Sequence, residues 1–281
     1  MDRIPPLEIF ESDFQALRKL IASEAGFKLS DFKKVFLVSR LSPRLKELGL
    51  SNFKEYLRLL QNPDSKNGEI GHLINQITTN ETRFFRENHH FEYLAETYLP
   101  SLIREDKTPR RISFWSAGCA TGEEAYSLAM ILHDFKRKYP WIQPRILATD
   151  IDSRVLNKAQ SGFYPEKTAV HIPAPFLKKY FLKGVKEWSG WIKARSLIKE
   201  LITFDYFNLH KPKDLSWGPF DGIFCRNVLI YFLPQSQERI QKVFYQNLIS
   251  GGLLFLGHSE LLFCKEESFK SLGKTIYQKI G

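Results

Sequence analysis

Cysteine is scarce in this sequence of 281 residues. Only three are present, Cys119, Cys225 and Cys264, and they stand far apart without CxxC spacing. A disulfide framework requires paired cysteines, and a structural zinc site requires clustered ones, so neither is indicated. We expect three buried thiols and no metal site.

Long apolar runs are also lacking. No stretch approaches the roughly 18 consecutive apolar residues of a membrane-spanning helix. The opening stretch MDRIPPLEIFESDF does not have the basic-then-apolar layout of a secretory signal. Low-complexity tracts and internal repeats are absent. With 43% hydrophobic and 26% charged residues, the composition is that of a folded protein, and we expect it to be cytoplasmic.

Acidic residues are too few to balance the basic ones. The chain has 31 Asp and Glu against 41 Lys and Arg, a formal net charge of +10. Such an excess attracts an acidic partner. Nucleic acid, a membrane surface and an acidic protein all remain open on charge alone.

Residues 1–78 are predicted to form a small helical domain, because apolar residues recur there at spacings of three and four without strand-like alternation. Within it, Lys33, Arg40 and Arg44 stand at i, i+7 and i+11. If Pro43 kinks the helix rather than ending it, these three lie on one face. That face is interpreted either as a docking surface or as a solvated basic face without a partner.

The pattern changes from Arg111 onward to strands alternating with helices, which predicts an α/β domain over 111–281 with a parallel sheet covered on both sides. Residues 79–110 are assigned to a linker and the first helix of this domain. A stretch at about 178–204 breaks the alternation and is predicted to be an inserted antiparallel β-subdomain. Its Trp188 and Trp191 suit either a peptide-binding edge or a local hydrophobic cluster.

The stretch FWSAGCATGEEAYS at 114–127 contains a buried strand, a Gly turn and a helix that opens with Glu123 and Glu124. Two glutamates at a helix N-terminus repel phosphate, which argues against a dinucleotide, and the turn is not GxGxxG. Asp150 ends the next strand, where an acidic residue commonly binds the hydroxyls of a ribose. A nucleoside that carries an amino group and no phosphate fits, and S-adenosylmethionine is such a molecule.

Six motifs resemble the CheR family of chemotaxis receptor methyltransferases. They are TTNETRFFRENHHF, FWSAGCATGEEAYSLA, ATDID, FNL, FDGIFCRNVLIYF and GGLLFLGHSE, and they occur in order along nearly the whole chain. The resemblance implies a Rossmann-like S-adenosylmethionine-dependent methyltransferase domain that carries the inserted β-subdomain and follows the helical domain. It also implies an enzyme that methylates glutamate side chains of chemoreceptors and releases S-adenosyl-L-homocysteine.

The resemblance further implies roles for individual residues. Arg86 and Tyr231 are expected nearest the reacting methyl group, Glu124 at the methionine ammonium and Asp150 at the ribose. The full set expected at the cofactor is Asn80, Thr82, Arg86, Glu124, Asp150, Asn208, Leu209, Asn227 and Val228. The adjacent His89 and His90 do not share a helix face, and we interpret them as packing or capping residues.

The implied partner is the acidic cytoplasmic coiled coil of a chemoreceptor, which would dock on Lys33, Arg40 and Arg44. A receptor C-terminal tail peptide at the β-subdomain is a further candidate partner; nucleic acid and membrane insertion are not expected. Two other functions stay open: an S-adenosylmethionine-dependent methyltransferase acting on another acceptor, including nucleic acid, and a non-catalytic S-adenosylmethionine-binding signalling protein.

Overall fold

The computed structural model describes residues 8–103, 105–213, 215, 217–263 and 268–281. The chain divides into two compact units, 1–79 with 231–236, and 80–230 with 237–281. Cys119 and Cys225 are buried free thiols, as expected, whereas Cys264 lies outside the described residues.

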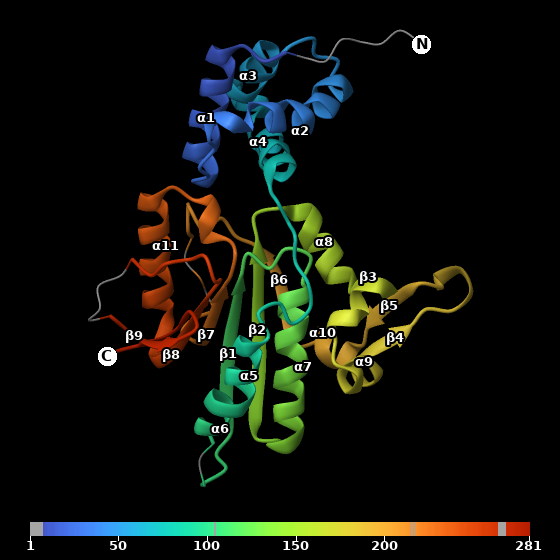
Figure 1. Ribbon diagram of the computed structural model, residues 1–281, viewed down its shortest axis with the longest axis vertical. Coiled ribbons are helices and arrows are strands. Elements are labelled where there is room, and N and C mark those ends of the chain that lie inside the picture. The colour runs from blue at the N-terminus through green and yellow to red at the C-terminus, as the bar shows by residue number, and fades with distance from the viewer. Residues whose placement is uncertain (1–7, 104, 214, 216, 264–267) are drawn as a thin grey trace. The chain divides into compact units, whose positions relative to one another are not determined.

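The first unit is helical, with elements α1 (Glu11–Ala25), η1 (Asp31–Lys33), α2 (Lys34–Glu47), α3 (Phe53–Gln61) and α4 (Pro63–Ile77) (Figure 1). Its core is built from the periodic apolar positions, such as Phe14 and Leu17 on α1 and Leu57 and Leu60 on α3. Pro43 lies inside α2 without ending it.

The second unit is built on a seven-stranded mixed sheet in the order β6-β2-β1-β7-β8-β10-β9. Strands β6, β2, β1, β7 and β8 are parallel, and β10 runs antiparallel to β8 and β9. The strands are β1 (Arg110–Ala117), β2 (Ile142–Asp150), β6 (Ile202–Tyr206), β7 (Phe220–Cys225), β8 (Leu248–Leu256), β9 (Phe269–Gly273) and β10 (Ile276–Lys279). Strand order reverses between β1 and β7, the place where α/β sheets bind ligands.

Helices alternate with these strands in the sequence and pack beside the sheet. Figure 1 shows α7 and α8 near β2 and β6, and α11 beside β7 and β8. The helical elements after residue 80 are α5 (His89–Tyr93), the π-helix η2 (Leu94–Tyr98), α6 (Leu99–Ser101), α7 (Glu123–Lys138), α8 (Ser153–Ser161), η3 (Glu166–His171), α9 (Ala174–Tyr180), η4 (Lys186–Trp188), α10 (Ser196–Lys199), η5 (Leu229–Tyr231) and α11 (Pro234–Asn247). The last residue of η5 and the first three of α11 belong to the first unit. The predicted fold class, an α/β domain preceded by a helical one, is confirmed.

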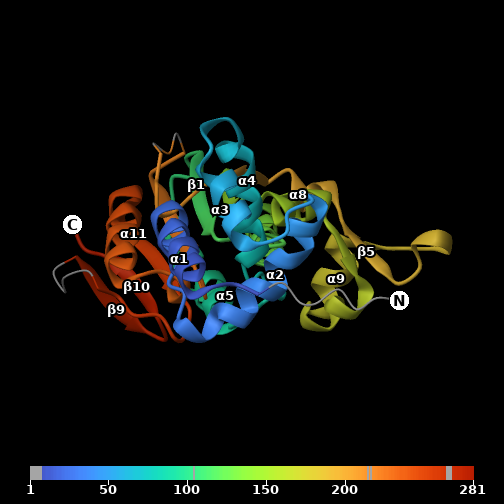
Figure 2. The ribbon, with the colours of Figure 1, turned by 90° about the horizontal axis from the view of Figure 1, so that it is seen from above.

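A small antiparallel sheet in the order β3-β5-β4 is inserted after α8, with β3 (Phe163–Pro165), β4 (Phe181–Lys183) and β5 (Trp191–Ala194). Figure 2 shows it and α11 at opposite ends of this unit. It starts earlier and ends earlier than the expected 178–204. β3 precedes α9 and joins through the long-range pair with β5, and 202–206 instead pairs with β2 as the edge of the main sheet.

Candidate functional site

The turn after β1 lies against the turn after β7. Gly118 and Gly122 have φ angles of 81° and 93°, which favour glycine. A Cβ atom on Gly118 would lie 2.5 Å from Cγ2 of Val228. The two turns approach so closely because β1 pairs with β7, and no side chain fits between them.

Asp150 ends β2 beside this turn and is 8% exposed. Its Oδ2 accepts a hydrogen bond of 2.9 Å from the amide of Ala120, and its Oδ1 accepts one of 2.9 Å from the amide of Asp152. Burial raises the pKa of this carboxyl group, and the two amides partly offset the effect. Each oxygen keeps a lone pair, so the carboxylate can accept two ribose hydroxyls.

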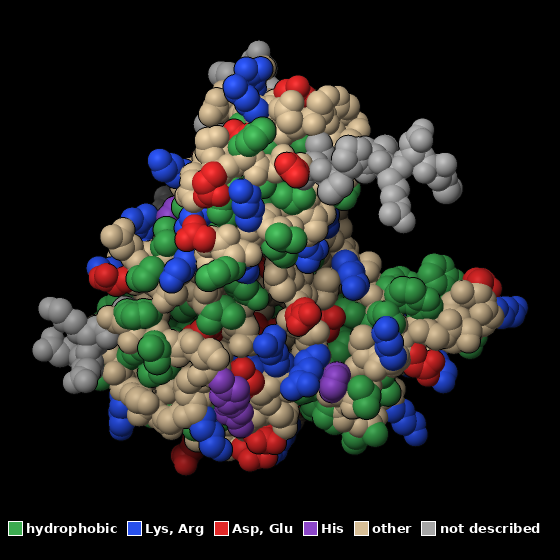
Figure 3. All heavy atoms as spheres, turned by 45° about the horizontal axis from the view of Figure 1, so that its top comes forward, with side chains coloured by type: hydrophobic (Ala, Val, Ile, Leu, Met, Phe, Trp, Pro, Cys, Tyr) green, Lys and Arg blue, Asp and Glu red, His purple; other side chains and the backbone are tan. Residues whose placement is uncertain are grey.

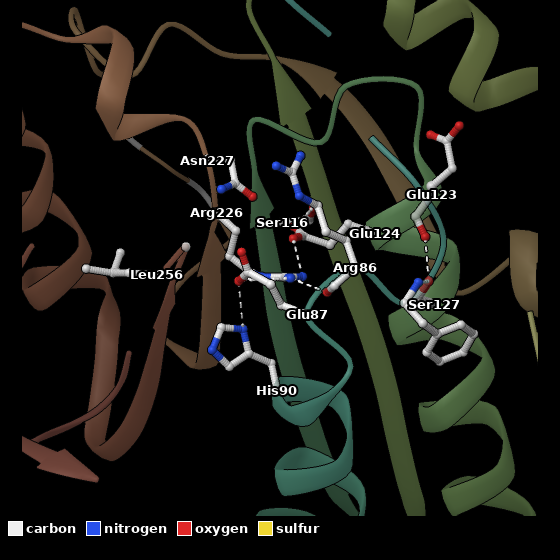
Figure 4. A network of polar contacts seen from close by, with 12 residues as sticks. Arg86, Glu87, His90, Ser116, Glu123, Glu124, Ser127, Arg226, Asn227 and Leu256 are labelled. Atoms are coloured by element: carbon white, nitrogen blue, oxygen red, sulfur yellow. Dashed lines mark hydrogen bonds and ion pairs between the residues drawn. The ribbon is translucent and has the colours of Figure 1, made fainter. Parts of the chain in front are cut away.

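A buried ion-pair network lies behind the Gly turn (Figure 4). The Arg226 side chain is 2% exposed; its Nη1 lies 3.2 Å from Oε2 of Glu124, and its Nη2 lies 3.2 Å from Oε2 of Glu87. Ser116 Oγ donates to Oε1 of Glu124 at 2.6 Å. Two carboxylates share one guanidinium, so the network has one unmatched negative charge and suits a cationic ligand group.

Burial and charge act differently on the two glutamates. Burial raises the pKa of Glu124, although Arg226 and Ser116 stabilise its ionised form. Burial opposes ionisation of Glu87 too, but Arg226 and the amide of His258 hold the pKa of Glu87 below its usual value. Glu124 is therefore the carboxylate whose charge gains more from an arriving ammonium group.

Arg86 lies in a segment of strained backbone. Its neighbours Phe85 and Glu87 have φ angles of 51° and 53°, in the left-handed region that non-glycine residues rarely adopt. The carbonyl of Arg86 accepts a hydrogen bond from Arg226, and the Phe85 amide donates to Oγ of Ser127 at 3.0 Å. Figure 4 shows Arg86 among the network residues. These contacts hold an arginine side chain on a fixed backbone.

Asn80 and Thr82 begin the same segment. Asn80 Nδ2 donates to Oδ2 of Asp152 at 3.0 Å, which fixes the segment to the residues that follow β2. Thr82 is half-buried. The partner of Asn80, Asp152, lies two residues after Asp150 in the chain.

Asn208 and Leu209 follow β6. The amide of His210 donates to Oδ1 of Asn208 at 2.9 Å, so this side chain shapes its own turn, and Leu209 is buried. After β7, Asn227 has a φ of 59°, and its Oδ1 is buried without a hydrogen-bond partner among the described residues. A buried amide oxygen of this kind can accept a hydrogen bond from a donor on a ligand.

Tyr231 belongs to the segment 231–236 that groups with the helical unit. Its carbonyl accepts a hydrogen bond of 2.7 Å from the amide of Lys28. Its catalytic role stays a prediction.

The two adjacent histidines fit packing. Nε2 of His90 contacts the carbonyl of Lys274 at 2.8 Å, and burial together with Arg226 lowers the pKa of His90 to about 3. The ring of His89 stacks on that of His258 at 5.1 Å. Across the described part of the chain, no group of three metal-ligating side chains is found.

The basic residues of the helical unit separate into two groups. Lys33 Nζ and Arg40 Cζ lie 5.2 and 5.3 Å from the ring centre of Phe36. Arg44 instead forms a two-pronged bond with Glu69, at 3.1 and 2.7 Å, and a third contact with Glu47. The charge of Arg44 is therefore paired within the helical unit, and a docking role for Lys33, Arg40 and Arg44 stays a prediction.

Three site residues were not singled out from the sequence: Glu87, Arg226 and Glu260. Arg226 does carry a signal, since it is a charged residue inside the apolar run IFCRNVLIYF. A charged side chain there is buried only with a partner, which points to a buried carboxylate elsewhere in the chain.

Comparison with known proteins identifies the family to which this fold belongs. Residues 12–78 match the family profile "CheR methyltransferase, all-alpha domain", and residues 80–278 match "CheR methyltransferase, SAM binding domain". The "Chemotaxis protein methyltransferase" of Escherichia coli K12 is 38% identical over 273 residues, which cover 96% of this chain and 92% of the relative. "Chemotaxis protein methyltransferase 2" of Pseudomonas aeruginosa is 37% identical, over 94% and 92%, and the Borreliella burgdorferi "Chemotaxis protein methyltransferase" is 36% identical, over 91% and 90%.

Fold, site and comparisons together define a Rossmann-like methyltransferase that uses S-adenosylmethionine. The chain belongs to the CheR methyltransferase family.

Proposed function

We propose that this enzyme transfers the methyl group of S-adenosylmethionine to glutamate side chains of chemoreceptors. The observation that carries the proposal is the buried network of Arg226, Glu87 and Glu124, which is one positive charge short, together with the buried carboxylate of Asp150 at the end of β2. The test is transfer of labelled methyl from S-adenosylmethionine to a purified chemoreceptor cytoplasmic fragment, with a fragment whose methylated glutamates are glutamines as the control.

The cofactor fits the residues present. Asp150 would hold the ribose, Glu124 the ammonium, and Asn227 with Val228 the adenine, with Asn80, Thr82, Asn208 and Leu209 around them. The unpartnered Oδ1 of Asn227 is the feature that such a ligand would use, and the close approach of Gly118 to Val228 holds the two turns together beside it. When bound, the cofactor supplies an electrophilic methyl group on a sulfonium.

The substrate glutamate needs no general base, because a carboxyl group with a pKa near 4.3 is ionised at neutral pH. One carboxylate oxygen forms the bond to the methyl carbon, the carbon–sulfur bond breaks, and its electron pair stays on sulfur, so no proton moves. The enzyme's contribution is alignment, which can lower a barrier by about 7–11 kcal/mol in favourable cases. Arg86 would orient the carboxylate by a two-pronged hydrogen bond, and Tyr231 would donate another.

We further propose that the partner is the acidic cytoplasmic coiled coil of the receptor, which would place the enzyme in the cytoplasm. None of the described helices is long and apolar enough to cross a membrane. Lys33 and Arg40 flank the ring of Phe36, while the nearby Phe32 is 96% exposed. Cations around exposed apolar side chains suit an acidic amphipathic helix.

Charge reversal tests this docking surface. Lys33→Glu with Arg40→Glu is expected to raise the KM for the receptor fragment roughly tenfold at low salt, with kcat unchanged, because exposed charges act mainly on association. Added salt should reduce the difference in KM between the wild type and this variant, because it screens exposed charges. Lys54→Glu, at an exposed position on α3, is the matched control. A KM that responds neither to the double reversal nor to salt contradicts the proposal.

A receptor tail peptide is proposed to bind the small sheet. Figure 3 shows apolar side chains gathered beside basic ones on it. They line a hollow of about 270 Å³ formed by Phe163, Leu182, Lys183, Gly184, Val185, Trp188, Trp191, Ile192 and Lys193. Trp188 and Trp191 are 54% and 40% exposed, which favours a binding edge over a closed cluster.

Trp188→Ala is expected to weaken binding of an acidic, aromatic tail peptide at least tenfold, measured by fluorescence anisotropy, because an exposed tryptophan anchor is lost. Leu197→Ala, which removes another exposed apolar side chain, should leave the affinity unchanged. Equal affinity of wild type and Trp188→Ala would show that the peptide does not use this hollow.

A further inference from the structure

A buried carboxylate at the end of β8 holds the turn that follows β7. Glu260 is 3% exposed. Its Oε1 accepts hydrogen bonds from the amides of Val228 and Leu229 at 2.8 and 2.7 Å. Its Oε2 accepts from the amides of Asn227 and Gly257 at 2.9 and 2.5 Å. Each oxygen thus has two donors, which is an arrangement for an ionised carboxylate.

These four amides form an anion-binding nest. The amides of 227–229 converge on one point, and the left-handed φ of 59° at Asn227 belongs to this conformation. Such nests at strand ends of α/β proteins commonly bind a phosphate of the ligand. In this chain a side chain of the protein itself fills the nest.

Gly257 makes the close approach possible. A Cβ atom at this position would lie 2.8 Å from the backbone nitrogen of Asn227 and 2.9 Å from Oε2 of Glu260. The end of β8 and the turn after β7 are therefore joined by backbone and carboxylate contacts without an intervening side chain. These contacts fix the conformation of the turn that carries the unpartnered Oδ1 of Asn227.

We propose that Glu260 is a positioning residue for cofactor binding: its carboxylate, held in the nest, fixes residues 227–229 in the conformation that receives the adenine. The inference rests on the proposed placement of the adenine at Asn227 and Val228. It predicts that the cofactor site depends on an anion in the nest and not on the glutamate side chain as such.

Chemical rescue tests this dependence. Glu260→Ala is expected to weaken binding of S-adenosylhomocysteine at least tenfold by calorimetry and to raise the KM for S-adenosylmethionine, with a much smaller change in kcat. Formate, a carboxylate small enough for the emptied nest, should restore most of the affinity in this variant and leave the wild type unchanged. A purely structural role would not give rescue of ligand affinity by formate.

Two further variants complete the design. Asp221→Asn removes another buried carboxylate, on β7, which accepts from the amide of Ser113 at 2.7 Å and pairs with Arg110, both on the neighbouring strand β1. It should lower stability without changing ligand affinity or responding to formate. Glu260→Gln keeps the shape but turns an NH₂ group toward amide donors, so it should fold, bind the ligand weakly and resist rescue.

Unchanged affinity in Glu260→Ala, or weak affinity in folded Glu260→Ala that formate does not restore, overturns the inference. If Glu260→Ala does not fold, wild-type affinity in Glu260→Gln overturns it equally. Ligand binding needs no methyl acceptor, so these results are independent of whether chemoreceptor glutamates are the substrate.

Discussion

Arg226→Met is expected to lower the free energy of unfolding by about 3–5 kcal/mol, because it leaves two buried carboxylates without their shared cation. Glu87 and Glu124 have side chains only 8% and 13% exposed, so water cannot replace the lost partner. The measurement is thermal or denaturant unfolding. Arg110→Met is the matched control, since the Arg110 side chain is 27% exposed in its pair with Asp221 and should contribute less.

The loss in Arg226→Met should depend on pH. Burial already raises the pKa of Glu124, and removing Arg226 removes the charge that opposes this shift. A carboxyl group whose pKa is higher in the folded state binds a proton more tightly there. Stability is then retained at low pH and lost as the pH rises above the unfolded-state value. We expect a larger deficit at pH 8 than at pH 5, and adding Glu87→Gln should recover part of it. Wild-type stability in Arg226→Met would contradict the proposed network.

Arg86→Ala is expected to lower kcat by about 10²-fold or more while the fold survives, because misplacement of a reacting group by about 1 Å can reduce turnover on that scale. The side chain is only half-buried, and the backbone contacts of Arg86 do not depend on it. Arg86→Lys should recover little, since an ammonium cannot form the two-pronged contact of a guanidinium.

Arg83→Ala is the control for Arg86→Ala, because Arg83 is an exposed arginine of the same segment. Initial rates at saturating S-adenosylmethionine and receptor fragment separate kcat from binding. Near-normal turnover in Arg86→Ala would remove Arg86 from the mechanism.

Local pattern was enough to predict much of this fold. Strands β1, β2, β7 and β8 are apolar runs bounded by turns. Asp150 could be located at the edge of the sheet because it is the last residue of one of these runs, β2. The glutamates after Gly122 excluded phosphate by simple electrostatics. In each case the residues that predict the feature lie within one or two adjacent elements, and the periodicity of the sequence is enough to identify such local features.

Contacts between distant segments could not be predicted in this way. Arg226 lies 139 positions from Glu87, and Glu260 lies 33 positions from Asn227, so only the folded sheet brings them together. The same reason explains Arg44, whose basic spacing suggested an exposed face although its partner is Glu69 on α4. The bounds expected for the small sheet differ from the observed ones because β3 is only three residues long. Its sequence carries no strand pattern, and it is a strand only through its pairing with β5.

The most direct test of the proposed function is the alkali lability of the transferred methyl group. A chemoreceptor cytoplasmic fragment is labelled with methyl-labelled S-adenosylmethionine and this enzyme, then treated with mild alkali. We predict that the label is released as volatile methanol, which is the product of glutamate methyl ester hydrolysis. Label that stays on the acceptor in alkali, or that is absent from the receptor fragment and present on nucleic acid, would contradict the account.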